Sequence, residues 1–201
     1  MINHWAKVRL EAAIEAYVPQ NAQEKADKDV FLECMKNYQN LLTRETLIAH
    51  FTSSAWIVNK NRTKTLMVHH NLYRSWSWTG GHADDNADLL EVAIREAKEE
   101  TGLQAVIPIT KEIFALDVLP VWSHMRNRIF IPSHLHLNLA YLLEADEEEP
   151  LTVLPTENSD VKWVHLDEVN QYSTEAGMYP VYNKLTSRLR ALLREKSDHQ
   201  V

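Results

Sequence analysis

The sequence predicts a mixed α/β sandwich preceded by a helical segment, on three observations. Residues 1–47 carry apolar side chains at helical spacing, segments rich in β-branched and aromatic residues begin near residue 48, and a strongly helical stretch at residues 87–101 lies among those segments. Strands around a central helix, closed by a last helix, are typical of a layered domain. We therefore expect an N-terminal extension at residues 1–47 and one domain at residues 48–201.

The composition is that of an ordinary globular protein. Its 201 residues leave room for one domain with an appendage. A formal charge of −7 argues against binding to nucleic acid, which requires a basic face. The one cysteine, Cys34, excludes an internal disulfide and indicates a reducing compartment. Without a signal-peptide pattern or a run of about 18 apolar residues, we expect a cytoplasmic protein and no membrane partner.

Two amphipathic helices account for the extension. The apolar side chains of residues 10–17 repeat at helical spacing until Pro19 ends the pattern. A second stripe covers residues 31–42, and Asp29 is its predicted N-cap. These helices either pack on the domain or act as a lid or dimerisation arm, so a homodimer is a hypothesis at this point.

The elements of the domain follow in order. Residues 48–58 and 63–70 are rich in β-branched and aromatic side chains, and the turn signal at residues 59–62 joins them as a hairpin. The last helix, at residues 180–195, begins at Pro180 and carries an apolar stripe. Three further strands are predicted at residues 113–119, 134–143 and 161–166.

An acidic cluster marks the helix at residues 87–101. Glu96, Glu99 and Glu100 fall within an arc of about 100°, on a side that we expect to face away from the core. Like charges at this spacing cost about 0.2–0.5 kcal/mol per pair. One interpretation is a solvated acidic face without function, which a helix tolerates at that cost. The other is a metal site, because Mg²⁺ takes oxygen ligands and bridges carboxylates to phosphates.

The segment Gly81–Leu103 resembles the signature of the Nudix hydrolases. That signature is a glycine, five residues, a glutamate, seven residues and then Arg-Glu-apolar-x-Glu-Glu-x-Gly-apolar. Gly81 takes the glycine position, and the run from Arg95 to Leu103 matches the second half without a gap. The resemblance implies the family's α/β/α sandwich with a mixed sheet. It also implies hydrolysis of a pyrophosphate bond in a nucleoside diphosphate linked to another group, or in a related diphosphate, with Mg²⁺ or Mn²⁺.

The resemblance further implies roles for individual residues of the segment. Glu96, Glu99 and Glu100 would bind the metal, with the carbonyl of Gly81 as a further ligand. Glu99 is also assigned to catalysis. Arg95 would serve catalysis by orienting a glutamate or the glycine loop rather than by touching substrate.

A further carboxylate is expected in a loop outside the signature. Glu157 lies six residues before Trp163, a spacing at which several family members place a metal ligand or general base. A general base must lie within hydrogen-bond reach of the proton that it accepts. We therefore assign Glu157 to catalysis, with Asp160 as its competitor and a solvated loop carboxylate as the alternative.

Substrate binding is assigned to four residues near the signature. Trp76 precedes the double glycine and His82 follows it directly. His134 and His136 alternate on a predicted strand, so both point to one face. That face either is solvated or lines the substrate cleft. A transition-metal site built on the two histidines lacks an apparent third ligand.

One position departs from the signature, because Ala87 stands where the first glutamate belongs. In the family that glutamate holds the glycine loop and the arginine more than the metal. We expect Asp84 or Asp88 to replace it as the partner of Arg95 or of the loop. Ala87 is the one feature that favours the alternative function, a non-catalytic Nudix-fold module for ligand binding or regulation.

Overall fold

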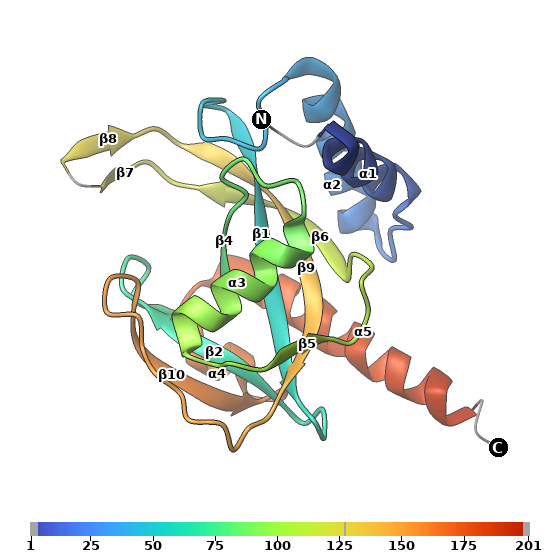
Figure 1. Ribbon diagram of the computed structural model, residues 1–201, viewed down its shortest axis with the longest axis vertical. Coiled ribbons are helices and arrows are strands. Elements are labelled where there is room, and N and C mark those ends of the chain that lie inside the picture. Colours follow the sequence, from blue (N-terminus) through green and yellow to red (C-terminus); the bar gives the residue numbers. More distant parts are fainter. Residues whose placement is uncertain (1–3, 127, 199–201) are drawn as a thin grey trace.

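A mixed β-sheet forms the centre of the computed structural model, which describes residues 4–126 and 128–198 (Figure 1). Helix α3 (Leu89–Thr101) lies on one side of the sheet and helix α5 (Tyr179–Asp198) on the other. The predicted α/β/α sandwich with a mixed sheet and a helical N-terminal region is therefore confirmed. The remaining helices are α1 (His4–Ala16), α2 (Ala22–Asn37), the short α4 (Val169–Tyr172) and a 3-10 turn (Ala176–Met178).

Within the part of the chain that the structure describes, the main sheet has eight strands. Its central path runs β10–β2–β1–β9–β5, while β3 pairs with β2, β4 with β1 and β6 with β9. The pair β1–β9 is parallel and the other pairs are antiparallel. The strands are β1 (Ala49–Asn59), β2 (Lys64–His70), β3 (Ser75–Ser77), β4 (Thr79–His82), β5 (Val106–Pro108), β6 (Ala115–Val121), β9 (His134–Ala145) and β10 (Asn158–His165).

Strand β1 is buried along its whole length because both faces of the sheet are covered. Ala55 and Ile57 belong to the core on the α3 side. Trp56 and Val58, which alternate with them, belong to the core on the α5 side, where Trp56 stacks on Tyr182. This alternation fixes which side chains of β1 face each helix.

Helix α3 ends where the sequence predicts, but it begins at Leu89, two residues later than the predicted start at residue 87. The side chain of Asp88 accepts a hydrogen bond from the backbone N–H of Glu91, which makes it the N-cap. Gly102 ends the helix with φ = 77°, a left-handed conformation that glycine adopts without strain. The acidic residues of the signature are therefore carried on a rigid, capped helix.

The extension packs on the domain through a buried charged network. Glu24 of α2 pairs with Lys184 and Arg188 of α5, and Lys184 also donates a hydrogen bond of 2.6 Å to Asp117 of β6. Asn21, rather than the predicted Asp29, caps α2. The prediction of Asp29 was wrong because an exposed aspartate is tolerated inside a helix, and the N-cap lies eight residues earlier than predicted.

A second, two-stranded sheet projects from the domain in Figure 1. It consists of β7 (His124–Arg126) and β8 (Ile129–Ile131), which the sequence did not predict. Met125, Ile129 and Phe130 are exposed on it, as is Trp122 just before β7. Among the described residues, no helix is both long and apolar enough to cross a membrane.

Candidate metal centre

Three carboxylates converge beside the glycine-containing strand β4. Ligand oxygens of Glu96, Glu100 and Glu157 all lie within 4.8 Å of one another. The first two are on α3, and Glu157 comes from the loop just before β10. The structure thus brings together residues that the sequence assigns separately to the metal and to proton transfer.

Glu100 is the buried member of this trio, with 2% of its surface exposed. Its Oε1 accepts a hydrogen bond of 2.8 Å from the backbone N–H of Gly80. Burial, and after it the nearby charges of Glu96 and Glu157, raise the pKa of Glu100 well above its usual range, although the Gly80 N–H opposes this. The expectation that Glu100 faces away from the core was wrong, because α3 packs on β4 through this carboxylate.

Glu96 lies directly against the glycine loop. A Cβ atom on Gly81 would collide with its carboxylate, so any larger residue at this position would require the Glu96 side chain to shift. Nη2 of Arg95 donates a hydrogen bond of 2.8 Å to Oε1 of Glu96. Burial raises the pKa of Glu96, and the hydrogen bond from Arg95 partly offsets the rise. Arg95 is therefore placed to orient a glutamate, as the sequence led us to expect.

Backbone hydrogen bonds hold Glu157 toward the helix. Its carbonyl accepts a hydrogen bond of 2.8 Å from the N–H of Asn71, and its own N–H donates to the carbonyl of Leu154 at 2.8 Å. The next residue, Asn158, is buried and donates through Nδ2 to the carbonyl of Glu100 at 2.9 Å. By contrast, its competitor Asp160 is exposed and accepts from the N–H of Val161.

Glu99 lies at the edge of the trio rather than inside it. Its side chain is 54% exposed, and its Oε1 is 3.9 Å from Nε of Arg95. It still contributes to the field at the site, since its charge helps to raise the pKa of Glu96 and of Glu100, after the larger effect of burial. Its predicted role as a ligand would require a shift of its side chain toward the other three.

The loop between β4 and α3 is tied to the N-terminal extension, not to Arg95. Asp84 accepts two hydrogen bonds from Arg44, at 3.0 and 2.7 Å, and these hold the pKa of Asp84 below its usual range. Asp88 is occupied as the cap of α3. The first alternative of the hypothesis, that either aspartate pairs with Arg95, was therefore wrong, while Asp84 does hold the loop, through Arg44. Arg44 lies outside the signature, so no sequence pattern pointed to it.

The position of the missing glutamate is part of the core. Ala87 is buried and belongs to the apolar cluster on the α3 side of the sheet. The chain nearby runs through two residues of left-handed conformation, Asp84 (φ = 44°) and Asp85 (φ = 72°). The N–H of Asp85 donates to the carbonyl of Leu42 at 2.9 Å, so the extension also holds the loop by its backbone.

Three of the four predicted substrate residues face one another instead of the carboxylates. His82, His134 and His136 gather around His50, a residue that the sequence reasoning missed. Burial lowers the pKa of His50 to about 4, with a smaller contribution from His134. Burial, and then the charges of the neighbouring histidines, also lower the pKa of His136.

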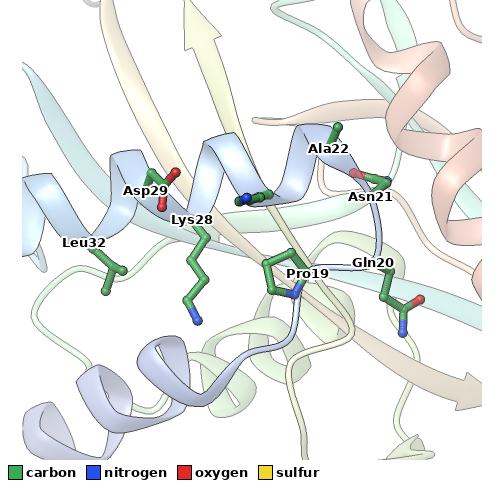
Figure 2. A pocket seen from close by; sticks show the side chains of 8 residues that line it. Pro19, Gln20, Asn21, Ala22, Lys28, Asp29 and Leu32 are labelled. Atoms are coloured by element: carbon green, nitrogen blue, oxygen red, sulfur yellow. The ribbon is translucent and has the colours of Figure 1, made fainter.

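The fourth predicted residue, Trp76, is engaged in packing. The Nζ atom of Lys162 lies 4.1 Å from the centre of its ring, and the ring of Tyr172 meets it edge-on. A hollow of about 530 Å³ at the turn between α1 and α2, lined by residues such as Pro19 and Asp29, contains none of the predicted site residues (Figure 2).

The acidic trio fits a divalent cation of the magnesium type. Oxygens bound to one Mg²⁺ at about 2.0–2.1 Å lie roughly 3–4 Å apart, and the ligand oxygens of the trio lie within 4.8 Å of one another, so small side-chain shifts would bring them to that spacing. After the larger effect of burial, the charge of Glu157 helps to raise the pKa of Glu96 and of Glu100, and Arg95 supplies one nearby counter-charge. A cation would relieve the repulsion between these carboxylates.

Comparisons with known proteins identify the family and the fold of the chain. The family model described as NUDIX domain matches residues 50–185. No curated protein sequence matches the chain. The structure is similar to an Ap4A hydrolase of C. elegans, with a TM-score of 0.53 and 17% identity, over 70% of this chain and 98% of that one.

Two further solved structures share the fold. A Nudix hydrolase of M. smegmatis, RenU, has a TM-score of 0.50 and 17% identity, over 73% of this chain and 86% of that one. The E. coli dihydroneopterin triphosphate pyrophosphohydrolase has a TM-score of 0.51 and 15% identity, over 67% of this chain and 92% of that one. At these identities the likeness establishes the fold, and the match of the family model establishes membership. The chain belongs to the Nudix family of pyrophosphohydrolases.

Proposed function

We propose that this protein is a divalent-metal-dependent hydrolase of a small-molecule diphosphate, either a nucleoside diphosphate linked to another group or a related compound. The observation that carries the proposal is the convergence of Glu96, Glu100 and Glu157 beside Gly81. Polyanionic pyrophosphates need positive charge and exact placement to react with water, and carboxylates on a rigid helix can hold a cation for that purpose.

The trio would hold Mg²⁺ or Mn²⁺, with Glu99 and the carbonyl of Gly81 as further ligands. The ion would supply positive charge for the phosphate oxygens and lower the pKa of water. Glu100 stays fixed in this arrangement because the Gly80 N–H and the surrounding core hold it. The site would thus be largely ordered before the substrate binds. Such prior positioning of the reacting groups is a large part of the rate acceleration in reactions of this kind.

Two residues of the chain would act around that centre. Arg95 is a positioning residue, since its hydrogen bond fixes the carboxylate of Glu96. Glu157 would accept the proton of the attacking water at a carboxylate oxygen, because it is less buried than Glu100 and extends from a loop into the site. Glu99, at the exposed edge, would meet the substrate side of the ion.

The substrate contacts need separate assignment. The sequence assigns substrate binding to Trp76 and to the histidines at positions 82, 134 and 136. In the structure these side chains pack against other residues and not against the acidic trio. Trp76 is confined by Lys162, and the histidines face each other. Substrate selection is therefore expected to depend on the loops around the trio.

A substrate screen tests the proposal. The purified chain is incubated with nucleotide sugars, dinucleotides, oxidised nucleotides and non-nucleotide diphosphates in Mg²⁺ or Mn²⁺, and phosphate is measured after a phosphatase step. We expect cleavage of at least one class, abolished by EDTA and restored by Mg²⁺. Tight binding of such a compound without turnover would instead support the non-catalytic module that Ala87 favours.

Two features of the protein's context are also proposed. Exposed large apolar side chains of the β7–β8 sheet, such as Phe130, are typical of a surface that another protein covers, which supports a homodimer. Light scattering during size-exclusion chromatography would give twice the chain mass, and a monomer mass would contradict the proposal of a homodimer.

The single, buried, unpaired Cys34 supports a cytoplasmic location, which we also propose.

A further inference from the structure

Four histidines from three strands meet at one end of the main sheet. His50 is on β1, His82 on β4, and His134 and His136 on β9. The ring centres of the other three lie 4.8–5.0 Å from that of His50. We propose that this cluster binds one transition-metal ion of the Zn²⁺ class, with His50, His82 and His136 as ligands and His134 completing the set.

The sheet register places the four rings on the same face. His50 lies opposite His136 in the parallel pair of β1 and β9, and His82 lies opposite Thr52, two residues from His50. Residues two apart in a strand share a face. His134 joins His136 for the same reason.

The cluster lies on the opposite face of the sheet from the acidic trio. Gly81 faces α3, since a Cβ there would meet the carboxylate of Glu96. His82 is the next residue of β4 and therefore points the other way. The proposed site is thus separate from the candidate Mg²⁺ centre, and it stands whether or not the proposed hydrolase function holds.

Three nitrogens are already close enough to share an ion. Ligand atoms of His50, His82 and His136 lie within 4.8 Å of one another. The Nε2 atoms of His134 and His136 are 3.3 Å apart and share a hydrogen bond, whose proton metal binding would displace. Nitrogens bound to Zn²⁺ at about 2.0–2.1 Å in a tetrahedron are separated by roughly 3.3–3.4 Å, so this pair already has the spacing of two ligands.

His50 gives an independent indication of a missing partner. The residue is only 5% exposed. Neither of its ring nitrogens makes a hydrogen bond of normal geometry to another described residue. The backbone of Thr46 lies near enough to stabilise the protonated ring slightly. A buried polar atom without a partner costs about 1–3 kcal/mol. A metal ion among the four rings would accept the lone pair of one of these nitrogens.

The protonation of His134 suits the same role. Its Nδ1 lies 2.9 Å from the carbonyl oxygen of Pro132, which can only accept a hydrogen bond. Nδ1 therefore carries the proton, and Nε2 directs its lone pair at the cluster. A ligating histidine is commonly fixed by such a bond from its other nitrogen to a carbonyl.

The donor set selects the kind of metal. Imidazole nitrogens without carboxylates favour Zn²⁺ and neighbouring transition metals over Mg²⁺. An ion held by β1, β4 and β9 would cross-link three strands next to the glycine loop. His82 and His134 are half-buried, which leaves a route from solvent.

The test is a metal titration of the full chain after removal of metals with EDTA. Zn²⁺ affinity and stoichiometry are measured by competition with a chromophoric chelator, and Co²⁺ is added separately as an optical probe. We expect one Zn²⁺ per chain, a higher melting temperature with Zn²⁺, and the strong visible absorption of tetrahedral Co²⁺. His50→Gln and His136→Gln should each lower Zn²⁺ affinity at least about 10²-fold, since even an outer partner of a ligand contributes 10–100-fold.

Two controls make the result specific. His165→Gln changes an exposed histidine of β10 and should leave Zn²⁺ affinity unchanged. The double variant Glu96→Gln/Glu100→Gln should also bind Zn²⁺ at the histidine site as the wild type does. If His50→Gln or His136→Gln fails to fold, His82→Gln, at a half-buried strand end, takes its place. Absence of saturable Zn²⁺ binding, or binding that the histidine variants leave intact and the glutamate variant removes, would overturn the proposal.

Discussion

The backbone N–H of Gly80 donates a hydrogen bond of 2.8 Å to Oε1 of Glu100, so the glycine strand and the acidic helix meet at a buried carboxylate. A Cβ on Gly80 would lie 2.6 Å from the carbonyl oxygen of Ser53, which explains why this strand residue lacks a side chain. Residues twenty positions apart in the sequence thus form one structural unit. The glycine loop positions the glutamate, and the glutamate holds the loop against α3.

Ala87→Glu, which restores the residue usual in the family, is expected to destabilise this chain. The position is buried in the apolar core, and an unpartnered polar group there costs about 1–3 kcal/mol. Ala87→Gln is the uncharged control of the same length. Burial raises the pKa of the new carboxyl, so the Glu variant becomes neutral as the pH falls. In urea unfolding, the difference in unfolding free energy between the Glu and Gln variants should therefore become smaller at lower pH. A Glu variant more stable than the wild type would show that an arginine reaches it.

Asp85→Ala should destabilise the protein by about 1 kcal/mol, whereas Asp85→Gly should not. The backbone at Asp85 is left-handed, with φ = 72°, a conformation that alanine adopts at a cost and glycine adopts freely. The same pair of changes at Asp29, inside α2, should give the reverse order, because helices prefer alanine to glycine by about 1 kcal/mol. Thermal unfolding of the four variants decides the point, and an identical order at both positions would refute the explanation.

Local patterns predicted the parts of the fold that depend on neighbouring residues. The end of α3 at Gly102 could be inferred because the glycine acts within the last turn of the helix, whereas the N-cap is Asp88 and not one of the residues 84–86 that the sequence offered. Strand β4 was missed since its sequence, Thr-Gly-Gly-His, has little intrinsic preference for a strand. It forms because β1 pairs with it and Glu100 holds its backbone.

The histidine cluster shows where sequence reasoning stops. His134 and His136 were predicted to share a face, and the third histidine that the proposed site requires is His50, which the parallel pairing of β1 with β9 brings opposite His136. That pairing joins segments 86 residues apart, and no local signal specifies it. Arg44 is a similar case, because its partner Asp84 is 40 residues away.

Lys184→Met should destabilise the protein by about 3–5 kcal/mol. The ammonium group is buried against Glu24 and Asp117, and its removal leaves two buried carboxylates with less compensation. Arg190→Met is the matched control on the same helix, since it breaks an exposed pair with Asp167 that contributes about 0–1 kcal/mol. Urea unfolding of both variants measures the difference, and equal losses would contradict a structural role for the network.

The stability of the protein should fall as the pH rises from about 4 through 6, in part because of Asp117. Burial raises the pKa of this carboxyl from 3.8 to about 6, although Lys184 opposes the rise. The folded state therefore binds the proton more tightly than the unfolded state, and this stabilisation is lost as the folded protein deprotonates. Asp117→Asn removes the titration, so its unfolding free energy minus that of the wild type should increase across this range. The exposed control Asp160→Asn should show no such trend, and a constant difference for Asp117→Asn would contradict the prediction.

The central claim is that the carboxylates of α3 hold a cation that hydrolysis requires. The most direct measurement is the initial rate of diphosphate cleavage as a function of Mg²⁺ concentration for the wild type, Glu100→Gln and Glu91→Gln. Gln keeps the shape of Glu100 and removes its charge, so we predict a loss of at least about 10²-fold at limiting Mg²⁺. Glu91, exposed in the first turn of α3, is the control and should leave the rate unchanged. Wild-type turnover by Glu100→Gln at limiting Mg²⁺ would contradict the account.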